Sequence, residues 1–215
     1  MSDREHWDAV YESKAPEAVS WYAPRLATSL DLVGGLGLAP TARIIDVGGG
    51  ASTFAQDLLA QGFERPTVLD ISQAAVDTSR RRMGEDAERV DWIVGDVTAV
   101  ELPQGRFDLW HDRAVFHFLT REDDRRRYVD AVLRAVKPGG HVIVATFGPE
   151  GPEKCSGLEV VRYSADALHA EFGATFEKLS SSTEIHQTPW GSTQAFLYCL
   201  CRRGGDAAPR PAGGA

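Results

Sequence analysis

The sequence of 215 residues lacks a long hydrophobic run, a signal-peptide core and an excess of basic residues. No apolar stretch approaches the roughly 20 residues that span a bilayer, so we expect no membrane partner. The polar first residues, Met1 to Glu5, predict a cytoplasmic protein without a secretion signal. The formal net charge of −8 argues against nucleic acid as a partner.

Cysteine is also scarce, with three residues and no Cys-x-x-Cys pair. An odd number of thiols favours a reducing compartment over a disulfide framework. Cys199 and Cys201 alternate in an expected strand, so we expect them to share one face as small core residues. A metalloid site of three thiolates that includes Cys155 is the less favoured alternative, and we expect no resident metal.

What the sequence does contain is a regular alternation of short apolar strands and helices. We expect strands over 43–47, 67–69, 89–94, 107–111 and 141–147, with helices between them that Ser72, Thr120 and Ser164 cap. Two further strands, 176–187 and 192–201, form a hairpin. The pattern predicts an α/β fold, a Rossmann-like doubly wound sheet of seven strands, mostly parallel with a C-terminal antiparallel hairpin.

Polar groups gather at the carboxyl ends of the first four expected strands. The first strand runs into Gly48-Gly49-Gly50, and Asp70, Asp96 and Asp112 each follow one of the next three. Parallel strands present these ends at one edge of the sheet, where ligands bind at the switch point of the strand order. This edge is therefore the candidate site.

The same residues favour one nucleoside class over another. Asp70 lies twenty residues after Gly50, where a carboxylate accepts hydrogen bonds from ribose hydroxyls. A dinucleotide site needs glycine at position 53 to complete Gly-x-Gly-x-x-Gly, and Thr53 stands there. Asp96 can instead accept from an adenine amino group while Val97 offers its backbone N–H. A nucleoside without a pyrophosphate fits this set better than NAD.

Five motifs in order carry a family resemblance: Ile45-Asp46-Val47-Gly48-Gly49-Gly50, Leu69-Asp70-Ile71-Ser72, Gly95-Asp96-Val97, Phe107-Asp108-Leu109-Trp110 and Lys137-Pro138-Gly139-Gly140. Over residues 1–202 the sequence resembles the class I S-adenosylmethionine-dependent methyltransferases, and its opening segment looks like that of small bacterial single-domain members.

The resemblance implies S-adenosylmethionine as the cofactor and assigns residues to its parts. Asp46 and the turn from Gly48 to Gly50 hold the amino-acid end, and Asp112 meets the ammonium or caps its own segment. Asp70 binds the ribose and Ile71 packs on the adenine. Asp96 and Val97 read the adenine edge.

Residues 1–25 are rich in aromatic side chains, namely Trp7, Tyr11, Trp21 and Tyr22. We expect this segment to form a lid in which Trp7, Tyr11 and Trp21 surround the sulfonium by cation–π contacts. Simple packing over the sheet edge is the alternative.

Candidate residues for the methyl acceptor follow the fourth strand and the terminal hairpin: Tyr22, Arg113, Phe116, His117 and His186, with His117 and Asp112 as candidate catalytic groups. A packed, hydrogen-bonded histidine remains the alternative for His117 and His186. His111 has a weaker claim to function.

We therefore expect a methyltransferase that acts on a small-molecule nucleophile by in-line transfer. The alternatives are a protein lysine methyltransferase of the same fold and a non-catalytic nucleotide-binding module. The expected organisation is a lid over residues 1–25, a methyltransferase domain over 26–202 and a flexible tail over 203–215, in a monomer or weak homodimer.

Overall fold

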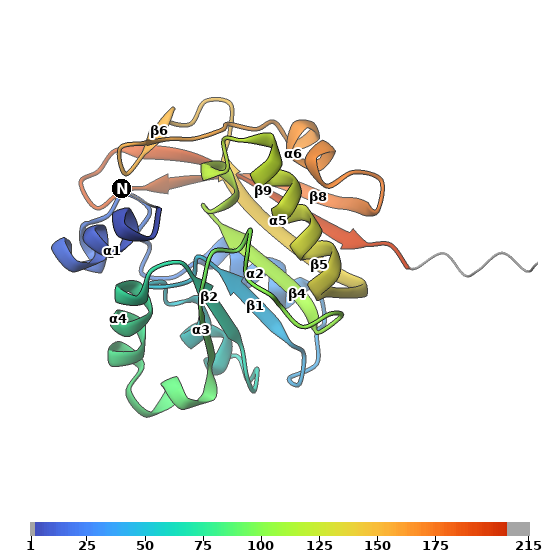
Figure 1. Ribbon diagram of the computed structural model, residues 1–215, viewed down its shortest axis with the longest axis horizontal. Helices are drawn as coiled ribbons and strands as arrows, with labels where there is room; N and C mark the ends of the chain where they lie inside the picture. Colours follow the sequence, from blue (N-terminus) through green and yellow to red (C-terminus); the bar gives the residue numbers. More distant parts are fainter. Residues whose placement is uncertain (1–2, 206–215) are drawn as a thin grey trace, which may run out of the picture.

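The computed structural model describes residues 3–205, and a twisted seven-stranded sheet runs through its centre (Figure 1). The strand order is β3-β2-β1-β4-β5-β9-β8. The strands are β1 (Ile44–Val47), β2 (Thr67–Asp70), β3 (Asp91–Val94), β4 (Phe107–Arg113), β5 (Val136–Phe147), β8 (Phe176–Gln187) and β9 (Thr193–Arg203). The first five pair in parallel, and β9 runs antiparallel between β5 and β8, which confirms the predicted fold class.

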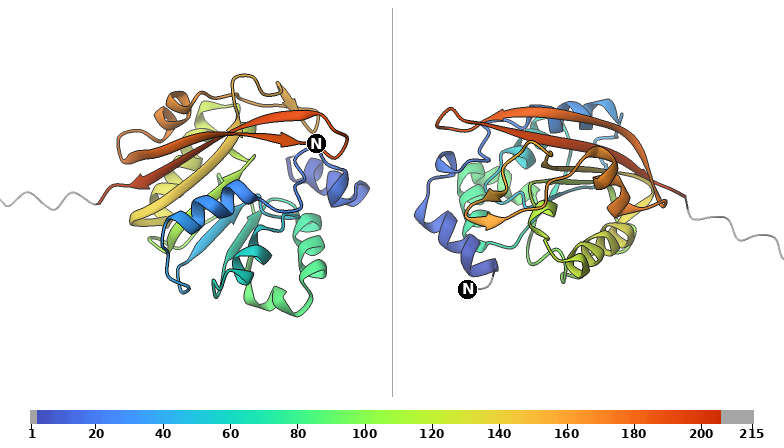
Figure 2. Two further views of the ribbon diagram at one scale, coloured as in Figure 1. Left: turned by 180° about the vertical axis from the view of Figure 1, so that it is seen from behind. Right: turned by 90° about the horizontal axis from the view of Figure 1, so that it is seen from above.

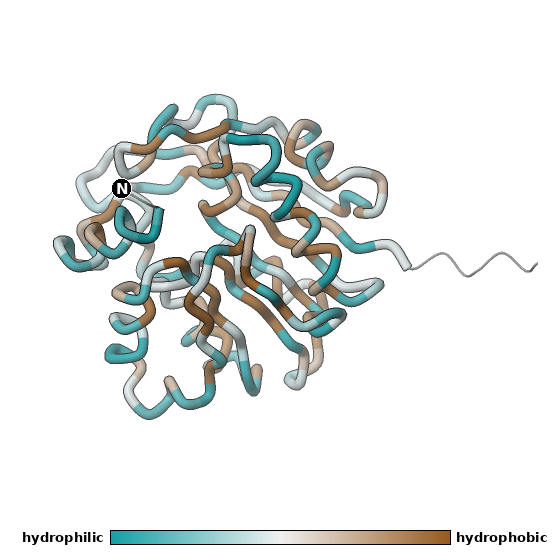
Figure 3. Tube along the Cα trace, viewed as in Figure 1, coloured by the Kyte–Doolittle hydropathy of each residue, from teal (hydrophilic) through white to brown (hydrophobic). Residues whose placement is uncertain are grey.

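Helices cover both faces of the sheet (Figures 1 and 2). One face carries α2 (Ala27–Gly35), α3 (Phe54–Ala60) and α4 (Gln73–Met83), and the other carries α5 (Glu122–Ala135) and α6 (Ala165–Phe172). Successive side chains of a strand point to opposite faces of the sheet, so Ile44 packs with α2 and α3 while Ile45 packs with α5. Both faces of the central strands are therefore apolar, which Figure 3 shows as brown segments through the middle of the molecule.

The remaining elements lie outside the seven-stranded sheet and the helices that cover it. α1 (Asp3–Ser13) precedes the sheet, and a two-stranded ribbon of β6 (Lys154–Cys155) and β7 (Leu158–Glu159) follows β5. Short 3₁₀ helices lie at Pro16–Ala18, Gly84–Arg89 and Phe116–Phe118. No helix within residues 3–205 is long and apolar enough to cross a bilayer.

Two of the three predicted helix caps are confirmed. The Ser72 hydroxyl accepts from the Ala75 N–H at 3.1 Å, and the Ser164 hydroxyl accepts from the Ala167 N–H at 3.2 Å. The prediction for Thr120 is wrong, because α5 begins at Glu122 after Arg121, with no side-chain cap. Three acidic residues in the first turn favour that helix end electrostatically instead.

Strand β4 is two residues longer than expected and carries His111, Asp112 and Arg113 on alternating faces. The cysteines Cys199 and Cys201 do share one face of β9, with their sulfur atoms 3.6 Å apart. Cys155 packs in the core on the opposite face, which contradicts the three-thiolate alternative. Most of the predicted tail, from residue 206 onward, lies outside the described residues.

Candidate functional site

Two adjoining cavities lie at the carboxyl ends of β1, β2 and β4. The larger has a volume of about 510 Å³, which is within the usual range for a small-molecule site, and the smaller about 50 Å³. They share Tyr11, Trp21, Gly48 and Arg113 as lining residues. Most of the predicted cofactor residues line the larger cavity, including Trp7, Asp70, Ile71, Asp96 and Val97. Asp46 and Tyr22 line the smaller cavity.

The glycine turn after β1 is packed against two carboxylates. A Cβ on Gly49 would fall 2.2 Å from Oδ2 of Asp46, and one on Gly50 would fall 2.5 Å from Oδ2 of Asp70. Gly48 has a φ of +68°, and a Cβ there would lie 2.1 Å from Val115. The turn therefore has no room for side chains and leaves its backbone open to a ligand.

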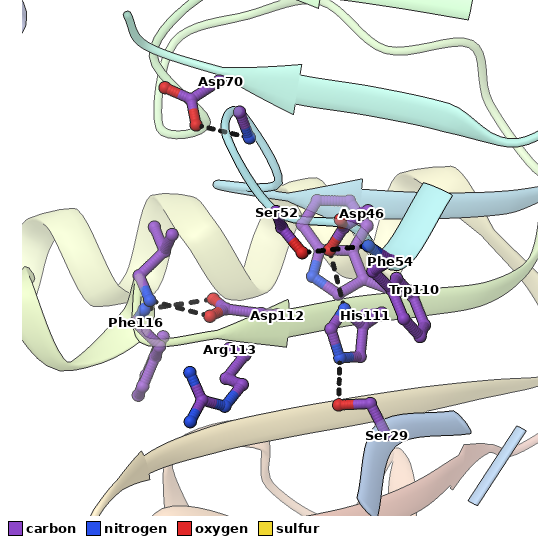
Figure 4. A network of polar contacts seen from close by, with 12 residues as sticks. Ser29, Asp46, Ser52, Phe54, Asp70, Trp110, His111, Asp112, Arg113 and Phe116 are labelled. Carbon is purple, nitrogen blue, oxygen red and sulfur yellow. Dashed lines mark hydrogen bonds and ion pairs between the residues drawn. The ribbon is translucent and has the colours of Figure 1, made fainter. Parts of the chain in front are cut away.

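Asp70 ends β2 and supports this turn (Figure 4). Its Oδ2 accepts from the Gly50 N–H at 2.9 Å and its Oδ1 accepts from the Ser72 N–H at 2.8 Å. Burial raises the pKa of Asp70 to about 6, although both backbone bonds favour the charged form. Each carboxylate oxygen retains a second lone pair for a ligand hydroxyl.

Asp46 takes part in a buried network that sequence reasoning missed. Its Oδ1 lies 2.7 Å from Nδ1 of His111, and Nε2 of His111 lies 2.8 Å from the Ser29 hydroxyl (Figure 4). The His111 ring stacks on Phe54 with ring centres 4.0 Å apart. The available signal was register, because Asp46 and His111 are direct neighbours in the β1–β4 pair.

Asp112 is absent from the described lining of both cavities and instead stabilises the chain that follows β4. Its carboxylate accepts from the N–H groups of Val115 and Phe116 at 2.8 and 3.0 Å, and from the Tyr128 hydroxyl at 2.6 Å. It is fully buried, and burial raises its pKa to about 6. Three roles were expected for Asp112: contact with the ammonium, capping and catalysis. The structure shows the capping role, because the carboxylate turns the chain between β4 and α5.

Three other predicted acceptor residues are also absent from the described lining of both cavities: Phe116, His117 and His186. Phe116 packs in the core against Tyr128. Nδ1 of His117 accepts from the Phe147 N–H at 3.3 Å, and burial lowers the pKa of His117 to about 3. His186 donates to the Ser20 carbonyl at 2.8 Å, so the packed alternative describes both histidines.

The aromatic N-terminal segment borders the larger cavity. The Trp7 ring contacts those of Trp21 and Phe118, with centres 5.6 and 5.1 Å apart, and Tyr11 contacts Trp21 at 6.4 Å. Burial raises the pKa of Tyr11 well above its ordinary value, so its hydroxyl stays protonated.

Hydrogen bonds hold this segment against the rest of the molecule at two places. Asp8 on α1 accepts from the Ser72 hydroxyl at 2.7 Å, which joins α1 to the start of α4. Arg113 donates to the Trp21 carbonyl at 3.0 Å and to the Tyr198 hydroxyl at 3.1 Å. Arg113 therefore connects the segment to the sheet while lining both cavities.

The larger cavity is also lined by residues that sequence analysis did not assign to a site. They are Cys155, Leu158 and Glu159 from the small ribbon, with Arg121 and Asp124 at the start of α5. Burial raises the pKa of Cys155 to about 11, so this thiol is protonated at neutral pH. Asp96 also lines this cavity, and its Oδ1 accepts from the N–H and hydroxyl of Thr98, both at 2.8 Å.

Residues 44–140 match the family model described as a methyltransferase domain. Nodulation protein S of Rhizobium tropici is 33% identical over 120 residues, which cover 56% of this chain and 48% of that protein. Ubiquinone/menaquinone biosynthesis C-methyltransferase UbiE of Ruegeria sp. (strain TM1040) is 27% identical over 132 residues, 60% of this chain and 46% of that protein. The chain thus spans about half the length of these two relatives.

Two further likenesses cover more of the chain. The eEF1A lysine and N-terminal methyltransferase of Danio rerio is 24% identical over 185 residues, 85% of this chain and 26% of that protein. A solved structure described as "Conversion of a Disulfide Bond into a Thioacetal Group during Echinomycin Biosynthesis" superposes with a TM-score of 0.77 at 21% identity, covering 96% of this chain and 95% of that one. At this identity the likeness shows a shared fold.

Proposed function

We propose that this chain, whose residues 44–140 match a methyltransferase domain, is a class I S-adenosylmethionine-dependent methyltransferase that methylates a nucleophile of a small molecule. The observation that carries the proposal is the cavity of about 510 Å³ at the carboxyl ends of the strands. It is bordered by strand-end carboxylates on one side and by aromatic side chains on the other, the mixed lining that small-molecule sites use.

The residues around the glycine turn fit the cofactor of this family. We propose that Asp70 accepts from the ribose hydroxyls, that Ile71 packs on the adenine and that Asp96 and Val97 read its edge. Gly48 to Gly50 and Asp46 hold the amino-acid end. The close contacts of Gly49 and Gly50 with the two carboxylates support this assignment, since a backbone without side chains permits close approach.

When bound, S-adenosylmethionine supplies a methyl group on a sulfonium that is already an activated leaving group. The protein then has to align the acceptor and exclude water, and alignment alone can contribute about 7–11 kcal/mol. Trp7, Trp21 and Phe118 form the apolar boundary that keeps water out. A general base is needed only for an acceptor that is protonated at the working pH.

A protein lysine methyltransferase is the second candidate, because one relative is named as an eEF1A lysine and N-terminal methyltransferase. The lining of the larger cavity includes the carboxylates of Glu159 and Asp124. Asp124 already pairs with Arg121 and Arg127, so Glu159 is the carboxylate that suits a cationic acceptor.

The test is transfer of label from S-adenosylmethionine carrying a labelled methyl group. The protein is incubated with separate panels of thiols, amines, phenols, halides, metalloids and lysine-containing peptides. Label in a small-molecule panel supports the first candidate, and label only in peptides replaces it with the second. Cofactor binding with no transfer to any panel would favour a non-catalytic module. Asp70→Ala, which lacks the ribose acceptor, serves as the low-binding control.

A further inference from the structure

Three buried polar side chains from three elements meet beneath the glycine turn. Asp46 on β1, His111 on β4 and Ser29 on α2 are at most 2% exposed. Nδ1 of His111 is 2.7 Å from Oδ1 of Asp46, and its Nε2 is 2.8 Å from the Ser29 hydroxyl. Packing against Phe54 fixes the plane of the imidazole ring.

The chemistry of these groups sets the direction of the bonds. A carboxylate only accepts, so Nδ1 of His111 carries a proton and donates it to Asp46. Nε2 lies within hydrogen-bond distance of the Ser29 hydroxyl, which can donate or accept. Ser29 thus holds the imidazole and the imidazole holds one oxygen of Asp46, as an outer partner orients a ligating group in many sites.

The other oxygen of Asp46 has no partner among the described residues. Oδ2 is buried without a hydrogen bond and lies against Gly49, and Asp46 borders the smaller cavity. Asp70 and Asp112 differ, because both oxygens of each accept from protein donors. A buried carboxylate oxygen is costly to leave unpaired, so this one is arranged for a donor that comes from outside the protein.

We propose that His111 and Ser29 are positioning residues that aim Oδ2 of Asp46 at the cationic group of the ligand in the smaller cavity. On the proposed function, on which this inference rests, that group is the ammonium at the amino-acid end of S-adenosylmethionine. Arg113 borders the same cavity, but its guanidinium is engaged by Glu184 at 3.3 Å and by the Trp21 carbonyl, so it leaves the charge of Asp46 for the ligand.

The experiment compares two ligands that differ at the amino-acid end. S-adenosylhomocysteine carries that end, whereas 5′-methylthioadenosine keeps the adenosine and sulfur and lacks it. By calorimetric titration, Ser29→Ala should weaken S-adenosylhomocysteine about 3- to 10-fold, the effect of one buried hydrogen bond, and change 5′-methylthioadenosine less than about twofold. His111→Asn, whose amide can still donate to Asp46, should lose less than His111→Leu.

Tyr128→Phe is the matched control, because it removes a buried hydroxyl from a different strand-end carboxylate, Asp112. It should lower thermal stability without changing the ratio of the two affinities. An equal loss for both ligands in Ser29→Ala, or no loss for either, would overturn the positioning role. Wild-type protein that binds neither ligand would instead contradict the proposed function.

Discussion

Replacing Asp70 with asparagine tests the site where the carboxylate both holds the glycine turn and faces the cavity. The asparagine oxygen can accept from the N–H of either Gly50 or Ser72, but its NH₂ group then faces the other N–H. Asparagine also lacks the negative charge that would accept hydrogen bonds from the ribose hydroxyls. Hydrogen bonds to a charged group contribute about 1.5–3 kcal/mol each. The loss of one such ligand bond predicts a Kd for S-adenosylhomocysteine that rises roughly 10- to 150-fold.

Asp112→Asn is the control for this change. Asp112 is equally buried at the end of a neighbouring strand, accepts from two backbone N–H groups and also has its pKa raised to about 6. Both variants should lose about 1–3 kcal/mol of unfolding free energy by chemical denaturation. Only Asp70→Asn should lose affinity in calorimetric titration. An affinity within twofold of wild type for Asp70→Asn, or equal losses in both variants, would refute the ribose role.

The remaining predictions concern pH and the aromatic segment. Because the pKa of Asp70 is about 6, affinity for S-adenosylhomocysteine should fall as pH drops below 6, by up to about tenfold per unit, and titrations of Asp70→Asn should show no such fall. The folded pKa of His117, about 3, lies below its ordinary value of 6.5, so the unfolded state binds the proton first. The stabilisation that comes from keeping His117 neutral is complete above pH 6.5 and is lost as pH falls toward 3. In denaturant titrations, the free energy of unfolding of His117→Asn should therefore fall less steeply between pH 6.5 and 3 than that of the wild type. An identical pH dependence in both proteins would contradict the burial argument. Trp21→Ala should reduce turnover, or raise the KM of the acceptor that the panel identifies, more than it lowers Tm; a change in Tm alone would favour simple packing.

Most of the fold could be predicted because its signals are local. Apolar strands that end at Val47, Asp70 and Val94 define where the sheet edge lies, and serine caps mark the starts of α4 and α6. The failure at Thr120 has a physical reason, since a hydroxyl caps a helix only if the chain enters at its residue. Here the turn over Phe116–Phe118 moves the helix start to Glu122.

The position of the proposed cofactor residues beside a cavity was also predictable, whereas the partners of the carboxylates were not. Asp70 and Ile71 lie at the end of β2, Asp96 and Val97 lie just beyond the end of β3, and all four line the larger cavity. Asp112 has a similar position in the sequence, but its oxygens accept from Tyr128 on the following helix, α5, and from two local N–H groups.

The positions of the predicted acceptor residues depend on tertiary contacts, which no local sequence pattern indicates. His117 and His186 each bond a backbone group far away in sequence, at Phe147 and Ser20. Ser29 joins His111 across 82 positions, and Cys155 reaches the cavity through a two-residue strand. Spacing along the chain carries no information about such pairs.

The central claim is that the glycine turn holds the methionine end of a methyl donor and not a pyrophosphate. Calorimetric titration of the purified protein with S-adenosylmethionine and, separately, with NAD tests it most directly. We predict micromolar binding of S-adenosylmethionine and no measurable binding of NAD at the same concentrations. Tighter binding of NAD than of S-adenosylmethionine would contradict the account.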